Sequence, residues 1–484
     1  MLSFLLLTFG IKNTILSIEK NQRDLKDSME DIMQIIIVGC GKVGMTLAEE
    51  LTNEGHNLVM IDTNASKIEA AIENFDVMGF VGNGSSFNVL LEADVEKADL
   101  LIAVTGSDEL NLLSCLFAKK AGHCQTIARV RNPLYNKELG FIKEQLGISM
   151  IINPELAAAT EIARILRFPT AIKIDTFAKG RVELLKFRLK PEYKLDGYRI
   201  ADVIAQLKTD ILVCAVERGS EVAIPNGDFV IRDNDRLTII ATPKNSISFF
   251  RKVGVITSQV KNAMIIGGGT IGFYLAKILT EMKVKVHLIE SSRARCEELT
   301  ELLPGAIVIQ GDGTDRHLLF EEGLCNAEAF ITLTNLDEEN LFLALFAKKH
   351  SKAKLIAKVN RIIFDDIINE MDIDSIIYPK YITADYITRY VRAMQNSIGS
   401  NVETLHRILD NKAEALEFIV REESEVTGIP LSKLQTKDNL LIGCITRNGI
   451  NKIPRGHDSI EVGDSVIVVT SIKGLNDIRD ILKK

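Results

Sequence analysis

Two glycine-rich segments carry the residue types that bind a pyrophosphate group. Both have the pattern G-x-G-x-x-G directly after a short apolar run. Glycines at this spacing permit a tight turn, a close approach of the backbone to a pyrophosphate, and close packing of the helix that follows. The free amides and the dipole of that helix attract phosphate. The first segment is Gly39, Gly41, Lys42, Val43 and Gly44, and the second is Gly267, Gly269, Thr270, Ile271 and Gly272.

An acidic residue ends the apolar run after each glycine segment. Asp62 and Glu290 stand at the same distance from their loops, since the first loop starts at Gly39 and the second at Gly267. A carboxylate at this position accepts a hydrogen bond from a ribose hydroxyl and repels a 2′-phosphate. The pattern therefore predicts NAD(H) rather than NADP(H) in the first site. Arg293 weakens that preference in the second site, because an arginine can receive a 2′-phosphate.

The two segments belong to a repeat with a period of about 229 residues. Solenoid repeats have periods of about 20 to 50 residues, so this period indicates two whole modules. Further paired positions are Asn83 with Asp312, Thr105 with Thr334, Asp108 with Asp337, Asn111 with Asn340, Arg129 with Lys358, Pro225 with Pro454, and Asp235 with Asp464.

Alternating strand and helix patterns surround each glycine segment. Apolar runs at 58–61, 100–104, 126–130 and 148–152 alternate with helical stretches at 46–53 and 110–120. This order predicts the α/β class, with a Rossmann-like, doubly wound parallel sheet in each module. Shorter strand patterns at 182–189, 211–216 and 237–241 predict a small α+β lobe after it. We expect residues 243–262 to join the modules, and a helix at 384–395 to end the second nucleotide domain.

The composition limits the setting and the partners. A net charge of −7 without a basic stripe argues against nucleic-acid binding. The seven scattered cysteines contain no C-x-x-C motif, which favours a reducing compartment and argues against a zinc site. The apolar run in residues 1–9 is far shorter than the ~20 residues that span a bilayer. We interpret residues 1–32 as an extension that is disordered or precedes the true start, with a peripheral membrane anchor as the alternative.

The tandem order of these features resembles the TrkA family, the regulatory subunits of Trk potassium uptake systems. The resemblance covers about residues 33–484 and rests on the glycine loops, their acids, the Gly-Asn-Gly or Gly-Asp-Gly segments, and the small lobes. It implies nucleotide-binding KTN (RCK N-terminal) domains, each followed by an RCK C-terminal domain. The implied borders are 1–32 for the extension, 33–168 and 262–395 for the nucleotide domains, and 169–243 and 404–484 for the C-terminal domains.

The resemblance also implies a function without catalysis. Such a protein binds NAD or NADH, and in some cases ATP or ADP, on the cytoplasmic face of the membrane. It forms homo-oligomeric rings and gates a membrane-embedded potassium-translocating subunit of the Trk type. Without a basic amphipathic helix of its own, it would reach the membrane through that partner.

Site residues follow from the resemblance at matching positions. In the first module they are the five loop residues with Asp62, Asn83, Thr105, Gly106 and Arg129. In the second module they are the five loop residues with Glu290, Asp312, Thr334 and Lys358. Two positions depart from the family pattern, since Asn83 replaces an aspartate and Lys358 replaces an arginine. A lysine lacks the planar, two-pronged guanidinium, so we expect weaker phosphate clamping in the second module.

Other interpretations of these residues stay open at this stage. Asp108 and Asp337 lie where a helix N-cap belongs, so capping competes with ligand contact. Cys40 is either a redox-sensitive thiol at a helix N-terminus or a small packing residue. Arg129 binds either a phosphate or a carboxylate on a neighbouring domain. We further expect Gly41→Ala or Gly44→Ala to abolish nucleotide binding while leaving the fold intact.

The rival functional class is an NAD-dependent oxidoreductase. Such an enzyme needs a general acid or base near the hydride site, usually in a second, substrate-specific domain. None of the seven histidines lies after a nucleotide-domain strand with a repeated partner, and the small lobe is itself duplicated. The sequence therefore favours a binding protein over an enzyme.

Overall fold

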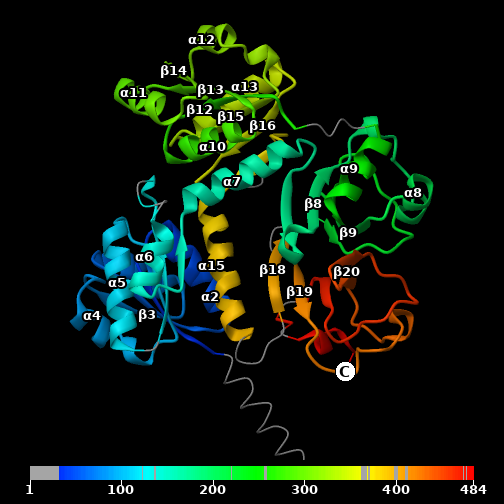
Figure 1. Cartoon of the computed structure of the whole chain (residues 1–484), viewed down its shortest axis with the longest axis horizontal. Coiled ribbons are helices and arrows are strands. Elements are labelled where there is room, and N and C mark those ends of the chain that lie inside the picture. Colours follow the sequence, from blue (N-terminus) through cyan, green and yellow to red (C-terminus); the bar gives the residue numbers. More distant parts are fainter. Residues whose placement is uncertain are drawn as a thin grey trace, which may run out of the picture. The chain divides into compact units, whose positions relative to one another are not determined.

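A computed structural model describes most of the chain (Figure 1). The described residues are 32–122, 124–133, 135, 138–219, 221–254, 259–360, 368, 371–396, 402–408, 412–472, 474–475 and 477–483. The interpretation of residues 1–31 as an extension lies outside them. The chain divides between Asn153 and Pro154 into two compact units, which are described separately.

The first unit is a Rossmann-like fold, of the kind predicted for the nucleotide domains, built on one parallel sheet. Its strand order is β3-β2-β1-β4-β5-β6, the order of a doubly wound sheet. The strands are β1 (Gln34–Val38), β2 (Asn57–Asp62), β3 (Val77–Val81), β4 (Leu100–Ala103), β5 (Gln125–Arg129) and β6 (Met150–Ile152). The helices are α2 (Lys42–Asn53), α3 (Ala65–Asn74), α4 (Phe87–Glu92), α5 (Asp108–Ala121) and α6 (Leu139–Leu146).

The centre of this sheet fixes where a ligand can bind. β1 and β4 are almost continuous apolar runs because helices cover both faces, and the four residues of β4 are all buried. β2 and β3 follow on one side of β1, and β4 to β6 follow on its other side. The strand order therefore reverses beside β1, and the carboxyl end of β1 is the topological switch point of the sheet. Val38 at the end of β1 pairs with Ala103 at the end of β4. The loops after these two strands therefore meet at one crevice.

The second unit contains the same fold with the order β14-β13-β12-β15-β16-β17. The predicted α/β class with two Rossmann-like domains is confirmed. The strands are β12 (Asn262–Ile266), β13 (Lys285–Glu290), β14 (Ile307–Gln310), β15 (Ala329–Thr332), β16 (Lys354–Lys358) and β17 (Ser375–Ile377). The helices are α10 (Thr270–Glu281), α11 (Arg293–Leu302), α12 (Arg316–Glu321), α13 (Asp337–His350) and α15 (Pro379–Asn396).

A helix from the first half of the sequence packs onto this second nucleotide fold. α7 (Pro154–Arg167) lies against α10, and Figure 1 shows the two helices in contact. Ala158, Ile162 and Leu166 are fully buried in the core that also contains Leu275 and Leu279 of α10. Burial of a leucine or isoleucine side chain contributes about 1.5–3 kcal/mol. α7 is therefore part of the core of the second unit.

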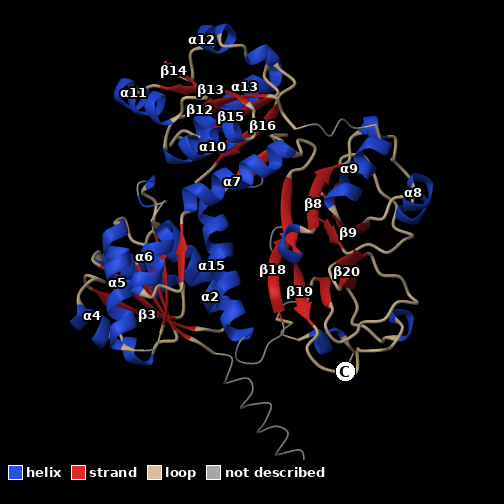
Figure 2. Ribbon diagram, in the orientation of Figure 1, coloured by secondary structure: helices blue, strands red, loops and turns tan. Residues whose placement is uncertain are grey.

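Two small lobes complete the second unit, each with a five-stranded antiparallel sheet (Figure 2). The first lobe has the order β10-β9-β11-β8-β7, and the second has the matching order β21-β20-β22-β19-β18. The first contains β7 (Lys173–Phe177), β8 (Val182–Arg188), β9 (Leu212–Arg218), β10 (Glu221–Ala223), β11 (Arg236–Ala241), α8 (Ile200–Leu207) and α9 (Pro243–Lys252). The second contains β18 (Val402–Ile408), β19 (Ala413–Ile419), β20 (Leu440–Arg447), β21 (Ile450–Lys452) and β22 (Ser465–Thr470).

The two lobes share one core between their sheets. Leu184 and Ile240 of the first lobe pack in one cluster with Ala415 and Ile467 of the second. The opposite face of the first lobe carries a separate core that includes Phe187. Alternate residues of β8 thus face two different cores, as the period-2 pattern of a strand requires.

The segment predicted to join the modules differs from expectation. Residues 243–252 form α9, whose first turn is capped by the Thr242 side chain. Phe249 and Phe250 are buried in the core of the first lobe. Residues 243–252 therefore belong to the first small lobe rather than to the join alone, which the adjacent phenylalanines did not reveal in the sequence. The helix predicted at 384–395 is α15, which starts five residues earlier at Pro379.

Each small lobe contains one buried aspartate that receives a two-pronged arginine. Asp235 is 1% exposed and accepts bonds of 2.8 Å from Nε and Nη2 of Arg218. Asp464 and Arg447 repeat this geometry with the same distances. The repeated aspartates found in the sequence are therefore structural residues of the lobes.

Candidate nucleotide-binding sites

The three glycines of the first loop meet three different constraints. Gly39 has a φ of 108°, and a Cβ there would lie 3.0 Å from the backbone of Thr105. A Cβ on Gly44 would lie 1.9 Å from the carbonyl oxygen of Gly39, whereas a Cβ on Gly41 would meet nothing within 4 Å. Gly39 and Gly44 are thus required by the protein itself, and Gly41 leaves open space beside the start of α2. That open space is where a pyrophosphate would approach the backbone.

Asp62 ties this loop to the helix after β2. Its Oδ2 accepts a bond of 2.8 Å from the Cys40 amide, and its Oδ1 accepts one of 2.9 Å from the Asn64 amide. The side chain is 12% exposed, with Lys67 Nζ at 3.9 Å. Each carboxylate oxygen has a second lone pair, so the acid retains the capacity to accept a ribose hydroxyl.

The second loop repeats this construction closely. Gly267 has a φ of 105°, and a Cβ on Gly272 would lie 2.1 Å from the Gly267 carbonyl oxygen. A Cβ on Gly269 would meet nothing within 4 Å. The carboxylate of Glu290 accepts bonds of 2.8 Å from the amides of Gly268 and Ser292. Both sites therefore have a closed glycine turn, an open middle glycine and a tethered acid.

A buried asparagine fastens the loop after the fourth strand in each nucleotide fold. Asn111 is fully buried, accepts the Thr105 amide at 2.8 Å, and donates to the Arg129 carbonyl oxygen at 2.9 Å. Asn340 does the same with Thr334 and Lys358, at 2.9 and 3.0 Å. Neither asparagine was predicted as a site residue. Their recurrence in the repeat was the signal that would have identified them.

Arg129 and Lys358 lie at corresponding places but make different contacts. The Arg129 guanidinium donates to the Thr105 carbonyl oxygen. The Lys358 side chain is 6% exposed, and its Nζ lies 3.4 Å from Asn335 Oδ1. Both cations point to the loop after the fourth strand. A phosphate contact from either residue stays a prediction.

Asn83 and Asp312 form identical turns. The Asn83 side-chain oxygen accepts the amide and the hydroxyl of Ser85, at 3.0 and 2.8 Å. Asp312 accepts the same two groups of Thr314, both at 2.8 Å. These bonds hold the pKa of Asp312 below its usual range. The departure from the family pattern at Asn83 therefore leaves the local turn unchanged.

The interpretation of Asp108 and Asp337 as helix caps is wrong. Ser107 caps α5, because its hydroxyl accepts the Leu110 amide at 3.2 Å. Asp108 instead accepts the amides of Arg131 and Asn132 at 2.9 and 2.8 Å. Asp337 accepts the side-chain amide of Asn360 at 2.9 Å. The two acids position the segment after the fifth strand. Gly106 also contributes, since its carbonyl oxygen accepts from Arg131 at 2.7 Å.

The structure favours the packing role of Cys40. The residue is 3% exposed. Burial, and next the Asp62 carboxylate, raise the pKa of its thiol to about 12. A thiol with a raised pKa is a poor nucleophile at neutral pH. Within the described residues, no group of three or more His, Cys, Asp or Glu side chains is placed to hold a metal ion, and no helix is long and apolar enough to span a membrane.

Comparison with known families gives one consistent result. The TrkA-N domain model matches residues 35–154 and 263–379, and the TrkA-C domain model matches residues 184–254 and 415–483. The Trk system potassium uptake protein TrkA homolog 1 of Methanosarcina mazei is 33% identical over 459 residues, which cover 93% of this chain and all of that protein. The chain belongs to the TrkA family.

Other members of this family extend the comparison to bacteria. The TrkA protein of Haemophilus influenzae is 30% identical over 448 residues, covering 91% of this chain and 96% of that protein. Among solved structures, the GsuK channel bound to NAD has a TM-score of 0.60 and 18% identity, covering 91% of this chain and 77% of that one. The isolated GsuK RCK domain has the same TM-score and identity, and covers 90% of this chain and 92% of that one. These structures support the fold.

Proposed function

We propose that this TrkA-family chain is a nucleotide-binding regulatory subunit that gates a Trk-type potassium-translocating subunit in the membrane. The observation that carries the proposal is the pair of complete glycine loops, each with an open glycine, Gly41 or Gly269, and a tethered acid. The relatives named above are Trk system potassium uptake proteins, and they match this chain over nearly their whole length. The similar GsuK channel was solved with NAD bound.

NAD or NADH is the proposed ligand of both loops, with ATP and ADP as further candidates. The proposed contacts are those predicted from the sequence, with the pyrophosphate on the glycine loop and a ribose on Asp62 or Glu290. Since Asp62 accepts the loop amide with one oxygen, the same carboxylate positions both the loop and the ribose. A 2′-phosphate would meet this negative charge, which favours NAD(H) over NADP(H) in the first site.

Gating requires that the ligand bind two shapes of the protein with different affinity. Each tenfold difference supplies about 1.4 kcal/mol, so four or more sites in an oligomer would supply several kcal/mol. The loop network of Asn111 or Asn340 provides a route, because it links the loop after the fourth strand to the fifth strand. A nucleotide that orders the loop would thereby stabilise one arrangement of the sheet edge.

A homo-oligomeric ring on the cytoplasmic face of the membrane is the proposed assembly. Several large apolar side chains of the nucleotide folds are exposed, among them Met78 at 64% and Phe342 at 68%. These side chains are the candidates that we propose for contacts within such a ring. The membrane partner is proposed from the names of the relatives, and nucleic acid is not proposed as a partner, given the net charge of −7.

An oxidoreductase role is not proposed. The polar side chains that surround the two loops, Thr105, Asn111, Thr334 and Asn340, bond to one another and to the backbone. These four side chains hold the loops in place, and the acids beside the loops, Asp62 and Glu290, accept hydrogen bonds from the loop amides.

The test combines binding with transport. Calorimetric titration of the purified protein with NADH, NAD, ATP and ADP identifies the ligand, and light scattering gives the oligomeric state. Deletion of the gene should impair growth at low external potassium, and expression of residues 33–484 should restore it. A monomer that binds no nucleotide, together with normal potassium uptake in the deletion strain, would refute the proposal.

A further inference from the structure

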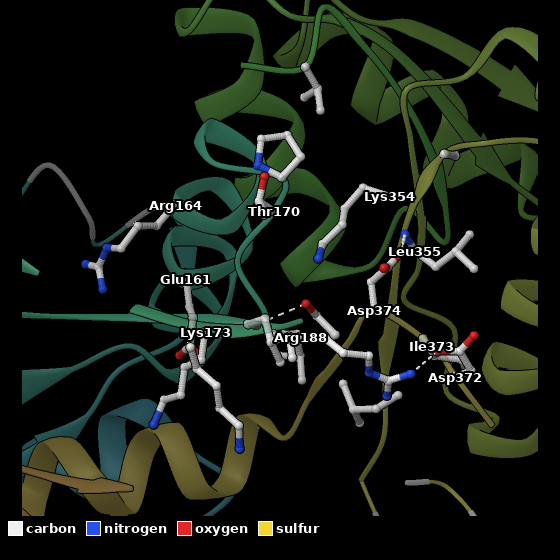
Figure 3. A pocket seen from close by; sticks show the side chains of 18 of the residues that line it. Glu161, Arg164, Thr170, Lys173, Arg188, Lys354, Leu355, Asp372, Ile373 and Asp374 are labelled. Atoms are coloured by element: carbon white, nitrogen blue, oxygen red, sulfur yellow. Dashed lines mark hydrogen bonds and ion pairs between the residues drawn. The ribbon is translucent and has the colours of Figure 1, made fainter. Parts of the chain in front are cut away.

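The second unit contains a large cleft whose charge is opposite to that of the protein. Its volume is about 1910 Å³, above the ~300–1,000 Å³ of usual ligand pockets. One wall is the sheet of the first small lobe, and the other is formed by α13, β16 and the segment before β17 (Figure 3). Twelve lysines and arginines but only seven aspartates and glutamates line it, whereas the whole chain has a net charge of −7. No residue from 267 to 272 lines this cleft.

The sheet wall places like charges directly opposite each other. Lys173 of β7 pairs with Lys186 of β8 in the strand register, and Arg188 of β8 pairs with Arg236 of β11. Such pairs are destabilising in antiparallel sheets. Glu217 alone serves two of these cations, with Lys186 Nζ at 2.6 Å and Arg236 Nη1 at 3.7 Å. Glu217 is thus shared by two cations, whereas Lys173 has carboxylates of its own, since Asp175 lies 3.3 Å away and Asp385 and Glu161 also act on it.

The opposite wall adds further cations. Arg188 and Lys348 both pair with the single carboxylate of Asp372. Figure 3 shows Arg188 beside Asp372, with Lys354 on the second wall of the cleft. Lys354 Nζ donates to the Ala171 carbonyl oxygen at 2.7 Å. Burial, and also the nearby Lys190 and Arg188, lower the pKa of Lys354 to about 8, although Asp374 opposes the change. Lys354 is therefore a buried cation on this wall, with one acid, Asp374, and two further cations nearby.

The duplicated lobe shows that the fold does not need these cations. The second lobe has the same strand order, and its register identifies the corresponding positions. Lys186 and Arg188 correspond to Glu417 and Ile419, because Ala241 opposite Glu183 matches Thr470 opposite Glu414. By the same register, Lys173, Arg236 and Glu217 correspond to Thr404, Ser465 and Thr446. One copy of the sheet has a cationic wall, and the other copy has none.

We propose that this cleft binds a small soluble anion with two or more phosphate groups, at a site separate from the glycine loops. Clustered lysines and arginines on two facing walls match a ligand that carries several negative charges. An arginine such as Arg188 can bind phosphate with two parallel bonds. The ligand would balance the excess of positive charge that the twelve lysines and arginines have over the seven aspartates and glutamates of the lining.

The test uses inorganic pyrophosphate as the probe and the full chain saturated with NADH. The wall variant takes residues from the second lobe, with Arg188→Ile, Glu217→Thr and Arg236→Ser, and adds Lys186→Gln. Removing Glu217 together with its partners avoids a buried, unpaired carboxylate. The control variant Lys120→Gln with Lys143→Gln changes the net charge by the same amount at two exposed positions.

We expect calorimetry to show at least a tenfold loss of pyrophosphate affinity in the wall variant and none in the control. Equal affinity in wild type and wall variant, or equal losses in wall and control variants, would overturn the proposal. NADH affinity should stay unchanged in both variants. If the wall variant fails to fold, the exposed Lys190→Gln variant serves, with a threefold loss as the expected result and no loss as the refuting one.

A lipid headgroup carries the same phosphate chemistry and is distinguished by a second measurement. Sedimentation with phosphatidylglycerol vesicles should be the same for wild type and wall variant if the ligand is soluble. Sedimentation that depends on the wall residues would overturn the assignment to a soluble anion.

Discussion

The two glycine loops reach the same shape with different residues beneath them. In the first unit, Cys40 occupies the second position of the loop, and the residue of α3 that corresponds to Leu299 in the repeat is Ala71, which is fully buried. In the second unit, the loop has Gly268, and Leu299 of α11 fills the space, since a Cβ on Gly268 would lie 2.6 Å from Leu299 Cδ1. The first unit thus pairs a cysteine in the loop with an alanine in the helix, and the second pairs a glycine with a leucine. The two loops have the same geometry. The second residue of the loop and the corresponding helix residue differ together between the two units.

The charges beside the two acids differ more than the shapes. Lys67 lies 3.9 Å from Asp62, half exposed, and its counterpart Arg295 donates to the Gly268 carbonyl oxygen at 2.9 Å. Arg293, which the sequence suggested as the cation that would accept a 2′-phosphate, instead pairs with Glu297 in solvent. The second site therefore has a fixed guanidinium beside its loop. We therefore predict that the two sites differ in their preference between NADH and NADPH.

The largest expected effect separates the glycines that shape the loop from those that face the ligand. Gly44→Ala or Gly272→Ala should destabilise its nucleotide fold by about 3 kcal/mol, because the new methyl group meets backbone oxygen. Gly41→Ala or Gly269→Ala should leave stability unchanged and abolish NADH binding in that site. Urea unfolding and calorimetry measure both effects. The expectation from sequence that Gly44→Ala leaves the fold intact is not supported, and equal stability of the Gly41 and Gly44 variants would contradict this distinction.

Neutralising the acids should have the next largest effect. Asp62→Asn should lower NADH affinity in the first site about tenfold to a hundredfold, as the loss of a charged hydrogen bond predicts. Glu290→Gln should do the same in the second site alone. Titration of each single variant and of the double variant separates the sites. Asp94→Asn, at an exposed position of the first unit, is the control and should have no effect.

The paired packing residues provide a double-mutant cycle. In the second unit, Gly268→Cys alone should overpack the space under the loop, and Leu299→Ala alone should leave a cavity. The double variant reproduces the residues of the first unit and should recover about 1–2 kcal/mol relative to the sum of the single changes. Unfolding by urea measures the four proteins of the cycle. Additive effects would show that the two positions do not compensate each other.

The smallest effect concerns the cations beside the acids. Lys67→Ala should change NADH affinity by less than about 1 kcal/mol, since the pair with Asp62 is long and half exposed. Arg295→Ala should instead reduce the affinity of the second site for NADPH relative to NADH. Competition titrations in variants with one active site measure the ratio. A larger change in nucleotide affinity for Lys67→Ala than for Arg295→Ala would reverse our ranking of these two cations.

Much of the fold was predictable because its signals are local. Apolar runs such as 35–38, the glycines after them and the acids at the next strand end each follow from the chemistry of a few neighbouring residues. The repeat confirmed the pattern within one sequence. The strand order and the two Rossmann-like folds then followed from rules of chain connection.

The residues that sequence reasoning missed act through partners far away in the chain. Asn111 bonds to Arg129, and Asp108 bonds to Arg131, so their roles depend on which strands are neighbours. The cationic wall is harder still to predict. Lys173 and Lys186 become neighbours only when β7 and β8 pair in one particular register. No local pattern distinguishes such lysines from those of an ordinary exposed strand.

The packing of α7 has a consequence for how this protein can be divided. In the sequence, α7 precedes the first small lobe and belongs to the first module, yet its apolar face is buried with α10 of the second nucleotide fold. A fragment that starts at the second repeat, near residue 262, would expose the apolar surface that Ala158, Ile162 and Leu166 cover. A fragment that starts at Pro154 would retain it. The sequence repeat therefore has different borders from the segment that we expect to fold as an isolated fragment.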